Sequence, residues 1–355
     1  MNATLFLPKY GVKIDDPCCY PLGFMYVSAF LKGLGFNVKV LNYNVFDYDL
    51  REELKGQDAL YFTGADEFLP EIKAASSLAR EHGIKTIIGG VLATFDPESV
   101  KPYCDAVVSG EIEKNIHIDN ISWPDYEGFG IDEYHRRHSM RYMGVLASRG
   151  CPFSCTFCAH VCKYRERNLN MVADEIDHYI KTYRIEYLVF NDNTLNVRKS
   201  RFLQVCEMMK PRKIAWSAAI RADVFDDEMA VAAKDSGCQY FVIGVESFRQ
   251  DRLDKMKKRL KVEQLKRTLD ILHRHNLNYH GNIILGLENE TVDDIAAEVS
   301  ELPQGYNLYP VLMQPFCGVK ARSSLTPQQR GHLNQVFTEY ATERGMEVLP
   351  VCCRN

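Results

Sequence analysis

Three cysteines close together constrain this chain more than any other feature of its sequence. Cys151, Cys155 and Cys158 have the spacing C-x-x-x-C-x-x-C and follow residues 143–148, an apolar run that predicts a buried strand. So short a loop can bring three sulfur atoms to one metal cluster, and cysteine thiolates are the ligands of iron–sulfur clusters. Because a 4Fe-4S cluster has four irons, three protein ligands leave one iron open to another molecule.

A closed zinc site is the alternative for the same cysteines. Structural zinc sites use four protein ligands and usually pair one C-x-x-C unit with a second. Cys162 is the nearby candidate for a fourth ligand, and the residues alone leave both sites open. Gly150 and Phe157, together with the cysteine spacing, resemble the cluster loop of the radical S-adenosylmethionine (SAM) enzymes. In that family SAM chelates the open iron through its amino and carboxylate groups.

The chain after the cysteine loop continues to alternate strand and helix patterns. Six such units predict a partial (β/α)6 barrel whose functional groups gather at the carboxyl ends of its strands. The predicted strands are residues 143–148, 187–191, 214–219, 240–244, 279–285 and 308–314.

Polar residues at these strand ends match the radical SAM pattern in the same order along the chain. The resemblance implies that SAM is contacted by Phe157, Asp192, Asn193, Ser217, Arg221, Glu246, Ser247 and Ile284. Arg165 and Arg167 fit an R-x-R that follows the cluster loop in that family, with solvated surface charge as the alternative. No side chain is singled out as catalytic.

Residues 3–110 alternate short apolar runs with amphipathic segments. This alternation predicts a parallel sheet with helices on both faces, and the number of runs fits the flavodoxin-like strand order. In that order, ligands bind at the carboxyl ends of the strands. The apolar runs are residues 3–7, 38–41, 59–62, 85–88 and 106–108.

The loops after the last three of these runs are rich in small residues, which let a ligand approach the backbone. Together with residues 21–23 and 121–126, they resemble the cobalamin-binding domain and linker that precede many radical SAM barrels. The resemblance implies cobalamin contacts from Gly64, Ala65, Asp66, Glu67, Gly89, Gly90, Val91, Gly110 and Glu111. No D-x-H-x-x-G motif supplies a histidine to cobalt. A domain that has kept the fold and lost the corrinoid is the alternative.

The predicted organisation is an α/β chain in four parts. We expect a flavodoxin-like, Rossmann-type cobalamin-binding domain at residues 1–118, a linker at 119–140, a radical SAM barrel at 141–316 and a helical extension at 317–355. Thr326 and Pro327 predict the start of a helix that runs to about Arg344. Cys317, Cys352 and Cys353 have no assigned role.

Composition restricts the cellular setting. The net charge of -4 gives no reason to expect nucleic-acid binding, and no run approaches the length of a membrane span. Twelve cysteines without an export signal favour a reducing compartment, so we expect a cytoplasmic protein.

A corrinoid beside a radical SAM barrel implies methylation of an unactivated carbon. An electron-poor carbon radical cannot take a methyl cation from SAM, whereas a methyl group on cobalt can be passed to it. We therefore expect a cobalamin-dependent radical SAM methyltransferase supplied with electrons by a flavodoxin or ferredoxin. The short extension favours a peptide or protein side chain as substrate, and a small molecule is the other candidate. Cyclisation, ring contraction or oxidation without methylation, and a non-catalytic corrinoid or iron–sulfur sensor, remain alternatives.

Overall fold

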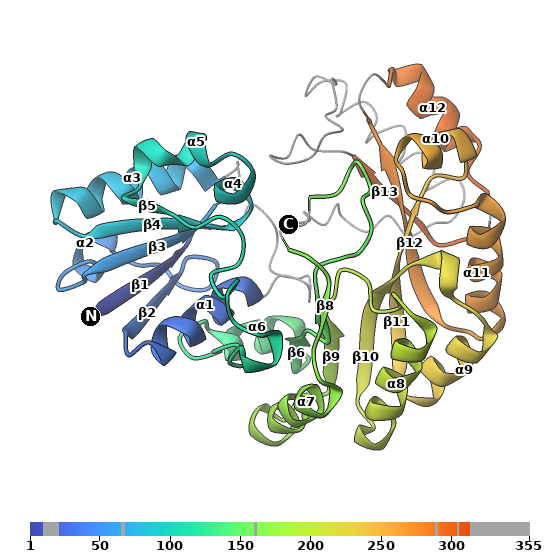
Figure 1. Cartoon of the computed structure of the whole chain (residues 1–355), viewed down its shortest axis with the longest axis horizontal. Helices are drawn as coiled ribbons and strands as arrows, with labels where there is room; N and C mark the ends of the chain where they lie inside the picture. The colour runs from blue at the N-terminus through green and yellow to red at the C-terminus, as the bar shows by residue number, and fades with distance from the viewer. Residues whose placement is uncertain (10–20, 65–67, 160–161, 288–289, 304, 313–355) are drawn as a thin grey trace.

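The computed structural model describes residues 1–9, 21–64, 68–159, 162–287, 290–303 and 305–312 of the chain. Two parallel sheets, one of five strands and one of six, organise this part of the molecule (Figure 1). The predicted α/β fold class is confirmed. The predicted extension at 317–355, with the helix from Thr326 and the cysteines Cys317, Cys352 and Cys353, lies outside the described residues.

The first sheet has the strand order β2-β1-β3-β4-β5 with every pair parallel. This is the flavodoxin-like order that the sequence predicts. The strands are β1 (Asn2–Leu7), β2 (Asn37–Asn42), β3 (Ala59–Thr63), β4 (Lys85–Gly89) and β5 (Ala106–Val107).

Helices cover both faces of the first sheet, as its alternating side chains require. Leu5 points to the face covered by α1 (Leu22–Gly33), whereas Phe6 points to the face covered by α3 (Leu69–Glu81). The shorter helices of this part are α2 (Leu50–Glu53), α4 (Gly90–Phe95) and α5 (Pro97–Val100).

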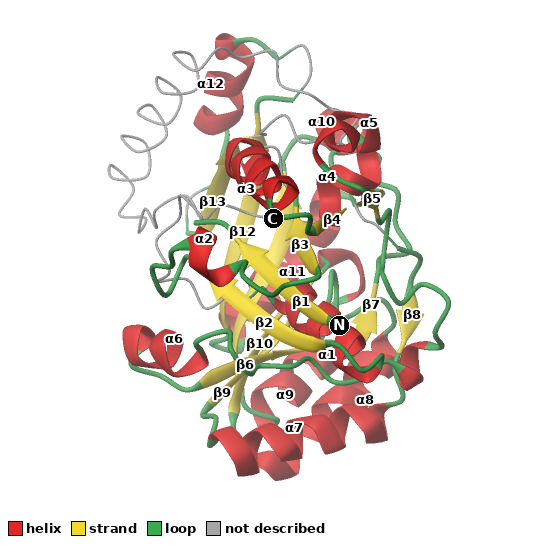
Figure 2. Ribbon diagram, turned by 90° about the vertical axis from the view of Figure 1, so that its left-hand side faces the viewer, coloured by secondary structure: helices red, strands yellow, loops and turns green. Residues whose placement is uncertain are grey.

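The second sheet has the order β13-β12-β11-β10-β9-β6, again with every pair parallel. Its helices lie on the outer side of the sheet (Figure 1 and Figure 2). Its edge strands are β6 and β13, and the barrel is open between them. The strands are β6 (Tyr142–Val145), β9 (Tyr187–Phe190), β10 (Ala215–Ile220), β11 (Cys238–Glu246), β12 (Asn278–Leu285) and β13 (Leu308–Leu312). The helices are α7 (Leu169–Tyr183), α8 (Lys199–Met209), α9 (Asp227–Asp235), α10 (Gln250–Lys255), α11 (Val262–Arg274) and α12 (Val292–Ser300).

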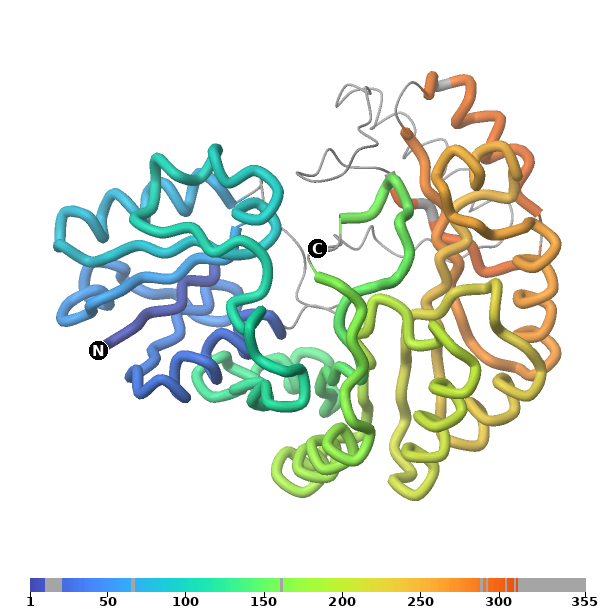
Figure 3. The backbone as a smooth tube through the Cα atoms, viewed as in Figure 1, coloured from blue at the N-terminus to red at the C-terminus, as the bar shows by residue number. Residues whose placement is uncertain are grey.

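The segment between the sheets, which contains α6 (Ile131–His138), packs against both of them. The Tyr126 hydroxyl donates a hydrogen bond to the Gly144 carbonyl on β6, and the Ser28 hydroxyl on α1 donates to Asp125. One hydrophobic cluster runs from the first sheet through Phe129 into the barrel. This shared core holds the carboxyl ends of the first sheet's strands toward the barrel (Figure 3).

Within the described ranges, every helix is too short or too polar to cross a bilayer.

Candidate functional site

A short ribbon closes the cysteine loop. β7 (Ser148–Arg149) and β8 (Arg165–Glu166) pair antiparallel, so the segment that contains the three cysteines begins and ends at neighbouring strands. Gly150 opens the loop with φ +76°, and a Cβ atom there would lie 2.5 Å from the Lys163 carbonyl oxygen. The position before Cys151 therefore requires glycine.

We expect Gly150→Ala to destabilise the loop by roughly 1–3 kcal/mol, because alanine would meet both a left-handed backbone and a backbone atom that cannot move aside. Iron and sulfide bound per chain after anaerobic reconstitution should fall. Gly56→Ala is the matched control, since Gly56 has φ +73° and a Cβ there meets nothing within 4 Å. Equal iron content in the two variants would contradict this packing argument.

The cysteine loop docks over the carboxyl ends of the barrel strands. The Thr156 amide donates to the Met256 carbonyl at 3.0 Å, next to α10. Phe157 packs against an apolar cluster that includes Ile284 at the end of β12. Two of the predicted SAM contacts, Phe157 and Ile284, are thus brought together.

The three predicted ligands lie within electrostatic range of one another, and none is in a disulfide. Burial raises the pKa of Cys158 to about 11, and the Cys155 and Cys151 thiolates add to that rise. A cubane cluster binds each thiolate to a different iron, so its ligands stand further apart than those of one ion. In the described part of the chain, His, Cys, Asp and Glu side chains form no three-ligand group for a single metal ion. This donor set fits an iron–sulfur cluster.

Cys162 has different neighbours from the other three cysteines of the loop. Burial and the Glu111 carboxylate raise the pKa of Cys162, and a hydrogen bond with Arg165 lowers it. Its thiol therefore belongs to the surroundings of Glu111 and Arg165. This arrangement supports a set of three cluster ligands over a closed set of four.

A buried ion pair lies beside the cysteine loop. Lys258 Nζ is 2.7 Å from Glu246 Oε1, and each side chain is 7% exposed. Burial raises the pKa of Cys155, and the Lys258 charge opposes that rise. Gly244 leaves the space that the pair occupies, because a Cβ atom there would overlap both charged groups. The pair lies at the end of β11, within electrostatic range of the predicted cluster ligands Cys155 and Cys158.

The backbone around this pair is strained. Glu246, Lys257 and Arg259 have φ of +66°, +52° and +55°, in the left-handed region that favours glycine. Each such residue costs about 1–3 kcal/mol and persists where the surroundings demand it. Lys258 lies between two of these residues, so its inward direction is imposed by the turn.

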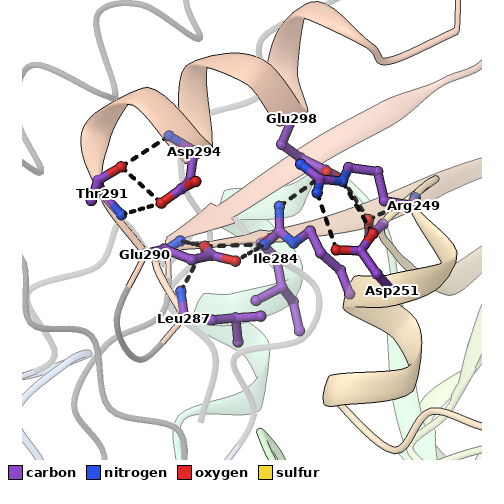
Figure 4. A network of polar contacts seen from close by, with 11 residues as sticks. Arg249, Asp251, Ile284, Leu287, Glu290, Thr291, Asp294 and Glu298 are labelled. Carbon is purple, nitrogen blue, oxygen red and sulfur yellow. Dashed lines mark hydrogen bonds and ion pairs between the residues drawn. The ribbon is translucent and has the colours of Figure 1, made fainter.

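A polar network joins Ile284, Glu290 and Glu298 at the ends of β12 and α12 (Figure 4). The Ser247 hydroxyl donates to Glu298 at 2.6 Å. Arg252, only 4% exposed, lies 3.1 Å from Glu298 Oε2 and 2.9 Å from Glu290 Oε1. It also donates to the Ile284 carbonyl at 2.8 Å. Arg252 thus holds the ends of two barrel strands at a fixed separation.

Asp192 supports the start of the cysteine loop. This residue is 3% exposed, and its carboxylate accepts hydrogen bonds from the Ala147 amide and the Ser148 hydroxyl. Burial raises the pKa of Asp192 to about 6, although these hydrogen bonds lower it. The neighbouring Asn193 is exposed. Of these two predicted SAM contacts, only Asn193 is exposed to solvent.

The raised pKa of Asp192 gives a pH-dependent prediction. Its carboxyl group favours the folded state while protonated, and this contribution is lost as pH rises from about 4 through about 6. A shift of about two pKa units is worth on the order of 3 kcal/mol. We expect the melting temperature of Asp192→Asn, relative to wild type, to rise across this interval and then level off. A difference that does not change with pH would contradict the assignment.

Arg221 follows β10 and ties the cysteine loop to the turn of Lys258. Its guanidinium donates to both Asp223 carboxylate oxygens at 3.0 and 2.9 Å and to the Lys258 carbonyl at 2.9 Å. Its central carbon lies 3.7 Å from the centroid of the Phe153 ring. Ser217 is half-buried on the same strand. Contact of Ser217 and Arg221 with SAM stays a prediction.

The predicted cobalamin contacts follow β3, β4 and β5. The Gly64 amide donates to the Gly89 carbonyl, and the Gly110 amide donates to the Thr94 hydroxyl, so neighbouring loops pack closely. Gly90 has φ +89°, and a Cβ there would lie 2.8 Å from Thr63 Oγ1. Close packing is thus one reason for these glycines. Val91 is half-buried, and Ala65, Asp66 and Glu67 lie outside the described residues.

Glu111 lies between the two sheets. Its carboxylate pairs with Arg149, at 2.8 Å, and with Arg165, both from the ribbon that closes the cysteine loop. Arg167 is buried and lies 2.6 Å from Glu175 Oε2. The solvated-charge alternative for Arg167 is therefore wrong. The role of Glu111 toward cobalamin stays a prediction.

Two family models match the two parts of this fold. The B12 binding domain matches residues 15–116, and the radical SAM superfamily matches residues 145–302. The chain belongs to the cobalamin-dependent radical SAM enzymes. The prediction of a 4Fe-4S cluster, SAM and cobalamin as cofactors is confirmed at the level of these families.

Individual relatives of this cobalamin-dependent radical SAM enzyme span most of its length. Bacteriochlorophyllide d C-12(1)-methyltransferase of Chlorobaculum tepidum is 25% identical over 331 residues, which cover 84% of this chain and 72% of the relative. Anaerobic magnesium-protoporphyrin IX monomethyl ester cyclase of Rubrivivax gelatinosus is 23% identical over 334 residues, covering 78% and 60%.

A solved structure supports the fold. The radical SAM methyltransferase TsrM of Kitasatospora setae, with a tryptophan substrate and a SAM analog bound, has a TM-score of 0.70 at 16% identity. The match covers 90% of this chain and 74% of that protein. At this identity the likeness shows the arrangement of the elements.

Sequence reasoning missed Lys258, Arg149 and Arg252. Lys258 lies in a basic run in which Lys255 and Lys257 are exposed, so charge alone predicts a solvated face. For Arg149, the position in the sequence is a signal that could have been used, because this arginine directly precedes Gly150 and Cys151.

Proposed function

We propose that this enzyme transfers a methyl group to an unactivated carbon atom of its substrate. The observation that supports the proposal is a single chain in which the carboxyl edge of a flavodoxin-like sheet is directed toward a three-cysteine loop on an open barrel (Figure 1). When bound, the cluster and SAM supply the radical that activates a carbon, and the corrinoid supplies the methyl group.

In this proposal the residues of the chain hold and orient these groups. Cys151, Cys155 and Cys158 bind the cluster. The Glu246–Lys258 pair receives the amino-acid end of SAM, whose carboxylate can accept a hydrogen bond from Lys258 and whose amino N–H groups can donate to Glu246. Phe157 and Ile284 supply apolar surface for adenine. Glu246, Lys258 and Ile284 are buried, and their burial limits the access of water to the radical.

A peptide or protein side chain is one substrate class that fits, because β6 and β13 leave the barrel open between them. A small molecule is the other, supported by relatives whose names specify a bacteriochlorophyllide or a protoporphyrin ester. Both classes enter the test.

The test is anaerobic reconstitution with iron, sulfide and cobalamin, followed by incubation with SAM carrying a trideuterated methyl group, a low-potential reductant and separate peptide and small-molecule fractions of a cell extract. The expected result is 5'-deoxyadenosine together with a component whose mass rises by one trideuterated methyl group in place of hydrogen. Bound corrinoid without any 5'-deoxyadenosine would favour a sensor.

Radical chemistry without methylation is the second candidate. The relative from Rubrivivax gelatinosus, which is named as a cyclase, is the observation that favours it. In that case 5'-deoxyadenosine forms and a substrate is consumed, but no deuterium from the SAM methyl group reaches the product.

A further inference from the structure

Arg149 is the point at which the cysteine loop meets the first part of the chain. Its side chain is 10% exposed, and its Nη1 atom lies 2.8 Å from Glu111 Oε1 and 3.6 Å from Glu113 Oε2. The central carbon of its guanidinium lies 4.3 Å from the centroid of the Tyr26 ring. These three partners all belong to residues 15–116, the B12 binding domain. Arg149 belongs to residues 145–302, the radical SAM domain.

The charges at this junction balance one another. Glu111 also pairs with Arg165, so two carboxylates and two guanidinium groups meet in one buried cluster. The Glu111 and Glu113 side chains are 12% and 5% exposed, which means that water screens their charges poorly. A buried charge whose partner is removed is strongly unfavourable. The cluster therefore resists any displacement that separates Arg149 from the two glutamates.

Arg149 is also linked to the predicted metal site through the backbone. It is separated from Cys151 only by Gly150, whose backbone is fixed against the Lys163 carbonyl. A shift of Arg149 relative to the first sheet therefore moves the first cluster ligand relative to that sheet.

The remaining contacts between the two parts act elsewhere. The shared hydrophobic cluster and the Tyr126–Gly144 hydrogen bond join α1 and the linker to β6. The linker also meets α7, where Tyr126 packs on Tyr179 and Asp119 accepts a hydrogen bond from the Asn168 amide. The hydrophobic cluster tolerates small slides, because apolar contacts are not directional. The hydrogen bonds of the linker lie away from the cysteine loop. The ionic cluster of Arg149 is directional and lies at the level of the loop.

We propose that Arg149 is a positioning residue that sets the distance between the cluster loop and the carboxyl edge of the first sheet, so that radical formation and methyl delivery occur at one substrate carbon. The consequence for methyl delivery rests on the proposed function. The geometric claim does not, and it is tested separately.

The geometric test measures a distance between the two parts of the holoenzyme. Spin labels are introduced through p-acetylphenylalanine at Phe46 and Val231, two exposed positions on the first part and on α9. We expect Arg149→Gln to broaden the distribution of label-to-label distances. The double variant Arg149→Gln with Glu113→Gln removes one charge of each sign and keeps the Glu111–Arg165 pair. Because the net charge of the cluster is unchanged, this variant is less prone to misfold than Arg149→Gln alone. Arg274→Gln, which breaks an exposed pair with Asp227, is the control. A wild-type distribution in both Arg149 variants would overturn the proposal.

The chemical test is the ratio of methylated product to 5'-deoxyadenosine, both counted per bound cluster. A displacement near 1 Å can cost a reaction on the order of 100-fold, so we expect the ratio to fall roughly tenfold or more in the double variant. Formation of 5'-deoxyadenosine should stay within about twofold of wild type, because the cysteine ligands are intact. A purely structural role would lower both products together and leave the ratio unchanged, which would overturn the proposal. If wild type transfers no methyl group, the proposed function fails while the distance measurement still decides the role of Arg149.

Discussion

Cys155→Ala should form no detectable 5'-deoxyadenosine when the reconstituted protein is given SAM and a reductant. Cys155 lies between the other two ligands in the loop, and burial and the Lys258 charge both act on its thiol. With two thiolates left, only two irons of the cluster have a cysteine ligand, and the protein no longer binds three irons while leaving the fourth open to SAM. We expect bound iron to fall as well, measured on the same samples as the nucleoside.

Cys162→Ala is the matched control for this experiment. The Cys162 thiol lies within electrostatic range of Glu111 and Arg165, and Cys151, Cys155 and Cys158 are not among the groups that most affect its pKa. Its removal should therefore leave both iron content and 5'-deoxyadenosine near the wild-type level. Loss of iron in both variants would mean a four-cysteine site. Formation of the nucleoside by Cys155→Ala would remove the cluster assignment itself.

The fold is largely readable from the sequence because its strands are buried on both faces and its helices are amphipathic. Residues 3–7, for example, are apolar apart from Thr4 and form most of β1, which is paired on both sides. The cysteine loop is equally readable as a metal site, because three thiols so close together in the sequence are typical of iron–sulfur and zinc sites.

The details of the site are harder to predict because a polar residue at a strand end has two uses. Asp192 and Ser247 match the pattern of SAM contacts, yet in the structure they satisfy the Ala147 amide and the Glu298 carboxylate. Buried polar groups nearly always find such partners, and the sequence does not show which. The role of Lys258 could not be predicted because it depends on backbone conformation. Its direction depends on left-handed backbone at Lys257 and Arg259, which no local propensity predicts.

Lys258→Met should weaken SAM binding by roughly 10- to 100-fold, the loss expected for one buried, charge-assisted hydrogen bond. Methionine keeps an unbranched side chain that ends one atom short of the ammonium nitrogen, so the variant removes the charge and leaves most of the packing. The measurement is the dissociation constant of SAM for the reconstituted protein, determined by equilibrium dialysis without reductant. Lys255→Met, an exposed lysine on the adjoining helix, is the control and should bind SAM as wild type does.

Decarboxylated SAM separates recognition from general damage to the site. If Lys258 binds the SAM carboxylate, wild type should prefer SAM to the decarboxylated analogue by a larger factor than Lys258→Met does. The iron–carboxylate contact is lost with the analogue in both proteins, so it cancels in the ratio of the two preferences. Glu246→Gln combined with Lys258→Met removes both charges of the pair and avoids an unpaired buried carboxylate. Equal preferences in wild type and in both variants would show that Lys258 only supports the strand end, and the amino-acid end of SAM would then have to be bound by other residues.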